Sequence, residues 1–181
     1  MTVADERAWH EWLVANDSSS NGVWLVLAKK GVTEPTSLTY AQALDEALCS
    51  GWIDGQRRSR DATTFMQRFT PRRPRSLWSR RNVEHIARLR EAGRVRSGGE
   101  RQVALAQEDG RWERAYAGSA DAVVPDDLAQ ALAAVPGATE RFAAQSAQDR
   151  FLAIAQLTTA VKPETRTRRM HRLIDKLMSA G

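Results

Sequence analysis

Residues 39–71, TYAQALDEALCSGWIDGQRRSRDATTFMQRFTP, decide the fold of the first half of the chain because their hydrophobic period changes once. Thr39 and Gln42 match a capping box, in which a hydroxyl and an amide satisfy N–H groups at a helix start. The following apolar residues repeat with helical spacing, and Gly51 is a typical left-handed stop. The pattern predicts a helix over 39–50.

Beyond Gly51 the hydrophobic period becomes two, which is typical of β-strands. The pattern predicts strands over 52–58 and 63–69, joined by a short turn. Alternation places Trp52 and Asp54 on one face of the first of these strands, together with Gln56, and it places Phe65, Gln67 and Phe69 on one face of the second.

Upstream of this stretch, VWLVLA at 23–28 predicts a third, buried strand, and residues 5–15 predict a short amphipathic helix. If 23–28 and 52–58 were parallel neighbours, the crossover between them would be right-handed. From Pro71 onward, prolines and glycines separate stretches of helical spacing, and 97–99 looks like a glycine-rich loop. The later helices are expected at 83–93, 100–108, 125–135, 138–145, 147–161 and 163–178.

These patterns predict an α+β fold, with a small sheet of about three strands near the N-terminus and a larger helical C-terminal lobe. At 181 residues we expect a single domain, 1–181, with a sheet-containing part at 1–75 and a helical part at 76–181. No apolar stretch approaches the twenty residues of a membrane-spanning helix, and the first residues do not match a signal peptide. We therefore expect a cytoplasmic protein without membrane insertion.

Few residue types in the chain suggest catalysis or metal binding. Cys49, the one cysteine, excludes an internal disulfide, and its place near a helix C-terminus disfavours a thiolate, so we expect it to be buried and structural. The three histidines lack metal-ligand spacing. No phosphate-binding loop, dinucleotide fingerprint or nucleophile elbow occurs, so no cofactor is expected.

Positive charge is concentrated in residues 57–101, which hold fourteen arginines and four acidic residues in a chain of net charge +5. Such a concentration favours an anionic partner, whereas the alternative is a solvated arginine-rich surface. Tryptophans flank this segment, and arginine beside an aromatic plane can bind flat or anionic ligands. The candidate ligand-binding residues are Lys29, Trp52, Asp54, Arg57, Arg68, Arg72, Arg73 and Trp78.

Three functions are compatible with this set. In the first, a non-enzymatic protein binds a small anionic or aromatic ligand, which Asp54 orients between Trp52 and Trp78. In the second, the arginines of 57–101 bind nucleic acid. The third and weakest is an enzyme with Asp54 as general base. Alternatively, Asp54 forms a structural salt bridge with an arginine such as Arg68. The oligomeric state stays open.

Six blocks carry a family resemblance: GVWLVLAKKG (22–31), TYAQALDEALCSGWIDGQRR (39–58), FMQRFTPRRPRSLWSRRN (65–82), DGRWERAY (109–116), VPDD (124–127) and TAVKPETRTRRM (159–170). In this order they resemble the bacterial YdeI/OmpD-associated family, also called bacteriocin-protection proteins, over about residues 20–178. The chain departs from the family pattern at Ser50 and Arg81. The resemblance implies a link to antimicrobial or envelope-stress tolerance and assigns no catalytic residue.

Overall fold

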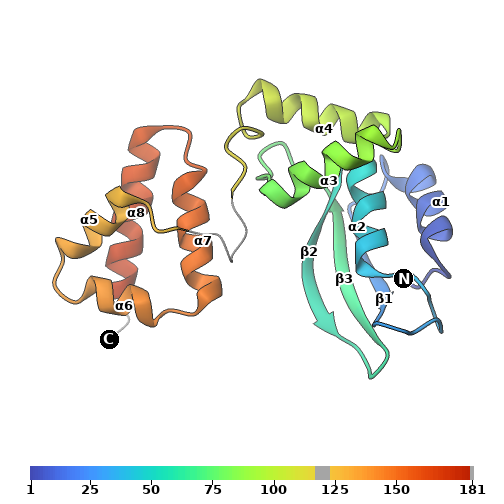
Figure 1. Ribbon diagram of the computed structural model, residues 1–181, viewed down its shortest axis with the longest axis horizontal. Helices are drawn as coiled ribbons and strands as arrows, with labels where there is room; N and C mark the ends of the chain where they lie inside the picture. The colour runs from blue at the N-terminus through green and yellow to red at the C-terminus, as the bar shows by residue number, and fades with distance from the viewer. Residues whose placement is uncertain (117–122, 180–181) are drawn as a thin grey trace. The chain divides into compact units, whose positions relative to one another are not determined.

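The computed structural model describes residues 1–116 and 123–179, and within them the chain forms eight helices and three strands (Figure 1). The α+β fold class is confirmed. The chain divides into two compact units. The first combines residues 1–76 with 82–112, and the second combines residues 77–81 with the chain from Glu113 onward. That the two units form a single domain stays a prediction.

The sheet of the first unit contains β1 (Val23–Ala28), β2 (Trp52–Ser59) and β3 (Thr64–Pro71) in the order β1-β3-β2. Both pairings with the central β3 are antiparallel. β1 and β2 therefore run in the same direction, but β3 lies between them. The right-handed crossover expected for parallel neighbours does not apply, because the two strands are not neighbours. The predicted hairpin of β2 and β3 is confirmed.

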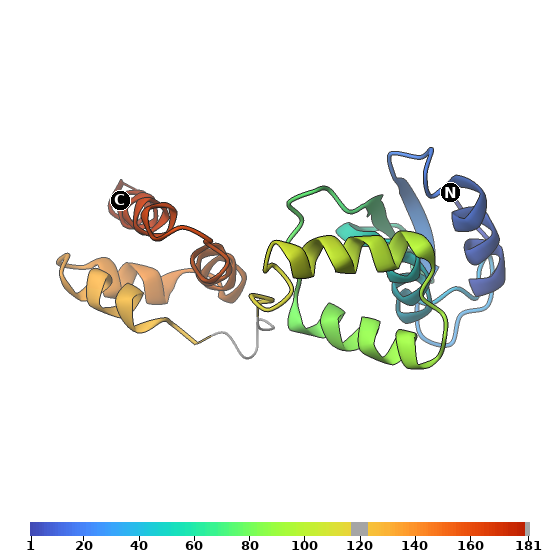
Figure 2. The same cartoon turned by 90° about the horizontal axis from the view of Figure 1, so that it is seen from above.

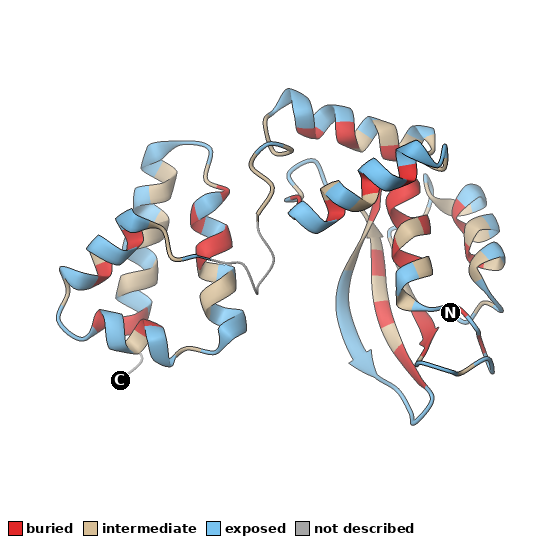
Figure 3. Ribbon diagram, viewed as in Figure 1, coloured by how far each residue is buried: buried red, intermediate tan, exposed pale blue. Residues whose placement is uncertain are grey.

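One face of the sheet is covered by α1 (Glu6–Asn16) and α2 (Tyr40–Cys49). The capping box of Thr39 and Gln42 is present. The Trp9 indole donates a hydrogen bond to the Ala43 carbonyl oxygen (3.1 Å), and its ring centroid lies 5.7 Å from that of Phe69. On β3, the predicted set of Phe65, Gln67 and Phe69 is buried on this face, while the residues between them are half-buried (Figure 3).

Two further helices, α3 (Arg80–Glu91) and α4 (Ser97–Glu108), lie mostly or wholly within the first unit (Figure 2). The predicted loop at 97–99 is wrong, because Gly98 and Gly99 belong to the first turn of α4. A Cβ atom on Gly98 would lie 2.6 Å from the Ser50 carbonyl oxygen, and one on Gly99 would lie 2.6 Å from that of Cys49. These glycines allow α4 to approach the end of α2 rather than breaking the chain.

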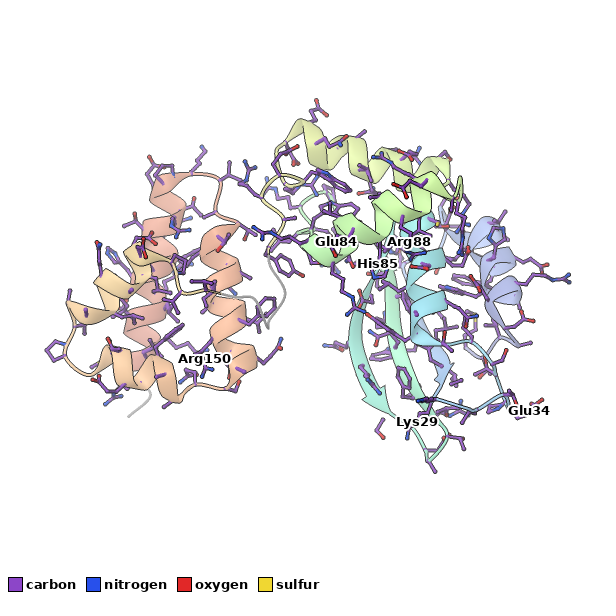
Figure 4. The ribbon with its side chains drawn as sticks, viewed as in Figure 1. Lys29, Glu34, Glu84, His85, Arg88 and Arg150 are labelled. Atoms are coloured by element: carbon purple, nitrogen blue, oxygen red, sulfur yellow. The ribbon has the colours of Figure 1, made fainter. Side chains whose placement is uncertain are left out.

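The second unit contains α5 (Asp126–Ala133), α6 (Ala138–Ala144), α7 (Ala147–Thr158) and α8 (Pro163–Ser179). Arginines bind the carbonyl groups at the ends of these helices. Arg150 donates to the Ala143 and Gln145 carbonyl oxygens (Figure 4), and Arg166 donates to that of Leu157. Because a helix C-terminus carries partial negative charge, these contacts stabilise the bundle. Its buried core consists of Leu128, Leu132, Ala138, Phe142, Ile154, Leu157 and Leu177.

Over the described parts of the chain, no helix is both long and apolar enough to cross a bilayer. The same residues contain no group of three or more His, Cys, Asp or Glu side chains that could hold a metal ion.

Candidate functional site

Trp52 lies in the aromatic core of the first unit. Its side chain is 1% exposed, and its ring meets those of Trp9 and Trp12 edge-on at centroid distances of 6.5 and 5.8 Å. The indole N–H donates to the Asp17 carbonyl oxygen (3.2 Å). Trp52 therefore packs α1 against the sheet and does not form an accessible wall for a ligand.

Lys29 lies at the opposite end of the sheet from Trp52. Its ammonium group donates to the carbonyl oxygens of Asp61 and Ala62 at 2.8 and 3.1 Å and so supports the hairpin turn. Trp52 pairs with Pro71 at the end of β3. Ala28, which directly precedes Lys29, pairs with Thr64 at the start of β3. At about 3.3 Å per residue, roughly 20 Å of strand separates the two positions.

Asp54 lies beside Tyr40, not beside Arg68. The Tyr40 hydroxyl donates to Asp54 Oδ2 at 2.7 Å. Asp54 pairs with Phe69 across β2 and β3, so both side chains point to the face that α1 and α2 cover. Arg68 is the next residue along β3 and points to the opposite face. The structure therefore brings Asp54 and Arg68 neither into an ion pair nor to one cavity.

The other predicted residues are also spread over the molecule. Arg72 is 5% exposed, and its main-chain N–H donates to the Gly51 carbonyl oxygen. Arg73 is exposed in the segment after β3. Trp78 is buried and belongs to the second unit. Of the eight predicted residues, Arg57 and Arg68 remain as accessible cations on the hairpin.

Arg68 lies on the face of the sheet opposite α1 and α2. We call the part of this face around Trp24, Arg58, Met66 and Arg68 the outer face. Trp24 pairs directly with Arg68, and the Arg58 guanidinium carbon lies 4.2 Å from the Trp24 ring centroid. Trp24, Met66 and Arg68 are half-buried, and Arg58 is exposed. No acidic residue of the three strands points to this face.

A bulge in β2 determines which arginine reaches the outer face. Asp54 pairs with Phe69 but Arg57 pairs with Gln67, so β2 has one extra residue between them. Arg57 consequently points to the covered face, where its guanidinium carbon lies 4.0 Å from the Phe65 ring centroid. Arg58 points to the outer face. Simple alternation would have exchanged these two arginines.

Three arginines of the β2–β3 hairpin, Arg57, Arg58 and Arg68, differ from Arg60, which forms an ion pair with Asp61 in the turn. Among the described residues, no acidic side chain forms an ion pair with Arg57, Arg58 or Arg68. The guanidinium groups of Arg57 and Arg58 lie over aromatic rings, and no acid of the described residues neutralises their positive charge. Such groups are available for phosphate or carboxylate oxygens of a partner.

The arginines at 88–96 differ, because acids from other elements neutralise them. Arg94 donates to Glu46 and Glu6 at 2.6 and 2.8 Å, and Arg96 donates to Glu46 at 2.8 Å. His10 Nδ1 lies 2.8 Å from Glu46 Oε2. Burial alone would raise the pKa of Glu46, but hydrogen bonds from Arg94, Arg96 and His10 together hold it below its usual value. This cluster joins α1, α2 and the segment before α4.

A smaller cluster of the same kind joins α2 to α3. Arg88 Nη2 lies 2.7 Å from both carboxylate oxygens of Asp45, and His85 Nδ1 lies 3.1 Å from Asp45 Oδ1 (Figure 4). Near it, Cys49 is buried, as predicted. Burial, with a contribution from the Glu46 charge, raises the pKa of the Cys49 thiol to about 11. At neutral pH this thiol is protonated and unreactive.

Trp24 and Arg58 were missing from the predicted site. Strand alternation would have separated Trp24 from Leu25 and Leu27, which fill the core, and so would have placed it on the other face. Arg58 had no such signal, because its orientation depends on the bulge.

Two family models match the chain. Residues 1–102 match a family described as Domain of unknown function (DUF8412). Residues 121–179 match the family described as Bacteriocin-protection, YdeI or OmpD-Associated. Searches of curated proteins and of solved structures gave no match. The YdeI/OmpD resemblance is therefore confirmed for 121–179, whereas the blocks between 22 and 82 lie in the region of the first family. The chain belongs to the DUF8412 family, and its residues 121–179 match the YdeI/OmpD-associated family.

Proposed function

We propose that the first unit binds single-stranded nucleic acid on the outer face of its sheet. The observation that supports this most is that Trp24 pairs with Arg68 and lies under the Arg58 guanidinium on one sheet face to which no acid of the strands points. Proteins that bind single strands without sequence preference combine cations for the backbone with flat groups on which bases stack. Trp24 and the guanidinium plane of Arg58 are flat groups of this kind.

A sheet face suits an extended strand better than a small ligand. Arg58 and Arg68 lie on neighbouring strands, and Arg57 lies on the other face of the same hairpin. Cations spread along a surface can follow successive phosphates, whereas a small anion needs them to converge. In a duplex both ring faces of a base are stacked on neighbouring bases and are not free to stack on the Arg58–Trp24 pair, so a single strand is favoured over a duplex.

Fluorescence anisotropy tests this proposal, with a labelled oligothymidylate of about twelve nucleotides, which is within the site size of known single-strand binders. The affinity is measured at about 20 mM and about 150 mM salt, because each neutralised phosphate of a single strand lowers log K by about 0.7 per tenfold rise in salt. We expect the double variant Arg58→Gln/Arg68→Gln to bind about tenfold more weakly, with a salt slope smaller by about 1.4.

The matched control is Arg101→Gln/Arg168→Gln, which removes the same charge at two exposed positions outside the sheet. It should bind nearly as the wild type does. A third variant, Trp24→Leu, should lose about 1–3 kcal/mol of binding free energy through the missing stack while keeping the salt slope. Failure of the wild type to bind at low salt, or an equal loss in the control variant, would contradict the proposal. An oligouridylate and a duplex of the same length show whether DNA, RNA or paired strands are preferred.

The match of residues 121–179 names bacteriocin protection, and we propose tolerance of an antimicrobial compound as the setting in which this binding acts. Loss of tolerance in cells that carry Arg58→Gln/Arg68→Gln, with normal protein levels, would support this link. Unchanged tolerance would show that nucleic-acid binding by the outer face and antimicrobial tolerance are independent.

A further inference from the structure

The second unit contains a hollow of about 620 Å³ between α7 and α8, with α6 at its base. All of its lining residues come from this unit and lie within the YdeI/OmpD-associated domain. Its volume is within the range of about 300–1,000 Å³ that is common for small-molecule sites. It shares no residue with the outer face of the sheet.

The floor of this hollow is apolar. Phe142, Leu157 and Leu177 form it, and they belong to the buried core of the unit. Leu152 stands at the side and is 46% exposed. Exposed apolar surface in a concave place is typical of ligand sites, since burying it gains free energy when a ligand displaces water.

The side formed by α8 is cationic. Arg172 and Lys176 are exposed there, and neither forms an ion pair with any acid in the described part of the chain. Arg169 also lines the hollow, but it donates to the Gln156 carbonyl oxygen and so supports the end of α7. The one acid among the described lining residues is Asp149, which accepts a hydrogen bond from the Ser146 hydroxyl at 2.6 Å at the start of α7.

We infer that this hollow binds a small anionic amphiphile, with its apolar chain or ring on the floor and its carboxylate, sulfonate or phosphate at Arg172 and Lys176. The charge on the α8 side disfavours cationic amphiphiles of the same length. The i, i+4 spacing of the two cations on α8 brings them to neighbouring positions on one helix face, where both can reach one head group.

The experiment uses 1-anilinonaphthalene-8-sulfonate as a fluorescent probe and decanoate as its competitor, with the full chain at neutral pH. We expect the probe to bind and decanoate to displace it, whereas decyltrimethylammonium should not. Decanoate should also raise the thermal midpoint, because a ligand of the native state stabilises it. Equal displacement by the cationic compound, or no binding of either anion, would overturn the inference.

Two variants locate the site. Arg172→Gln/Lys176→Gln should raise the dissociation constant of decanoate at least tenfold. Lys162→Gln/Arg168→Gln, which removes the same charge at exposed positions outside the hollow, should leave it within about twofold. Leu152→Glu places a carboxylate beside the floor and should abolish decanoate binding. Since all five positions are exposed, thermal midpoints without ligand should stay close to that of the wild type. Unchanged decanoate binding in the Arg172→Gln/Lys176→Gln variant would overturn the inference.

Discussion

The arginines of the β2–β3 hairpin and those at 88–96 are chemically identical but have different surroundings. Arg57 and Arg58 lie over aromatic rings, and no acid in the described part of the chain forms an ion pair with them. Arg94 and Arg96 bind Glu46, which is 4% exposed, and so connect three elements of the fold. The first group is available to a partner, whereas the second is already occupied within the protein.

This difference shows that a run of like charge in a sequence is not one surface. Arginine can satisfy its guanidinium group with carboxylates or by stacking on aromatic rings, and the two choices have different consequences. A buried ion pair is costly to break, because the remaining charge loses its partner. A stacked and solvated arginine can be removed with little effect on folding. The following predictions test this contrast.

The largest effect is expected for Glu46→Ala. It leaves Arg94 and Arg96 without their central acceptor in a half-buried place, so the first unit should lose about 3–5 kcal/mol of unfolding free energy. Urea denaturation followed by tryptophan fluorescence measures the loss. Glu91→Ala, an exposed acid on α3, is the control and should change stability by less than about 0.5 kcal/mol. Equal effects in both variants would remove the distinction between the two arginine groups.

Gly98→Ala should have the next largest effect. The added methyl group would lie 2.6 Å from the Ser50 carbonyl oxygen, so α4 must move away from α2, at a cost of about 1–3 kcal/mol. Because Arg96 lies directly before α4, the variant should also weaken its contacts with Glu46. Gly55→Ala, whose added atom would have 3.8 Å of room, should cost less than about 1 kcal/mol. Thermal unfolding compares the two variants.

Low pH should reduce the contribution of Glu46 to the free energy of unfolding. Its pKa in the folded protein lies below the usual 4.5, so its contribution to stability is complete above that pH and is lost as the pH falls through the lowered value. Glu46→Gln cannot titrate. The stability gap between the wild type and this variant should therefore be full at pH 7 and narrow below about pH 4.5. A gap that stays constant down to pH 3 would show that the charge of Glu46 is unimportant.

The smallest effect on folding is expected for Arg58→Gln/Arg68→Gln. Neither arginine has an ion pair among the described residues, and a solvated cation–π contact contributes about 0.5–1 kcal/mol. The unfolding free energy should change by about 1 kcal/mol or less, measured by urea denaturation. A loss as large as that of Glu46→Ala would mean that the hairpin arginines are structural, and the proposed outer face would lose its support.

Local patterns account for much of the fold. The capping box at Thr39 and the hairpin of β2 and β3 depend on neighbours close in the chain. The structure does not bring the predicted site residues together at one place. It combined Trp52, which is part of the core, with Lys29, which supports a turn at the other end of the sheet. Arg57 and Arg68 reach opposite faces of the hairpin, where Arg57 lies over Phe65 and Arg68 pairs with Trp24.

By itself the sequence determined the α+β class, the helix and strand periods and the concentration of arginine, because these follow from residue types and short-range spacing. The tertiary structure alone decided which arginines are neutralised and which aromatic ring each one meets. Glu6 and Glu46 reach Arg94 across 88 and 48 residues of chain, and one bulge reverses the faces of Arg57 and Arg58. Charge pairing is a contact between distant segments, so its pattern exists only after the chain has folded.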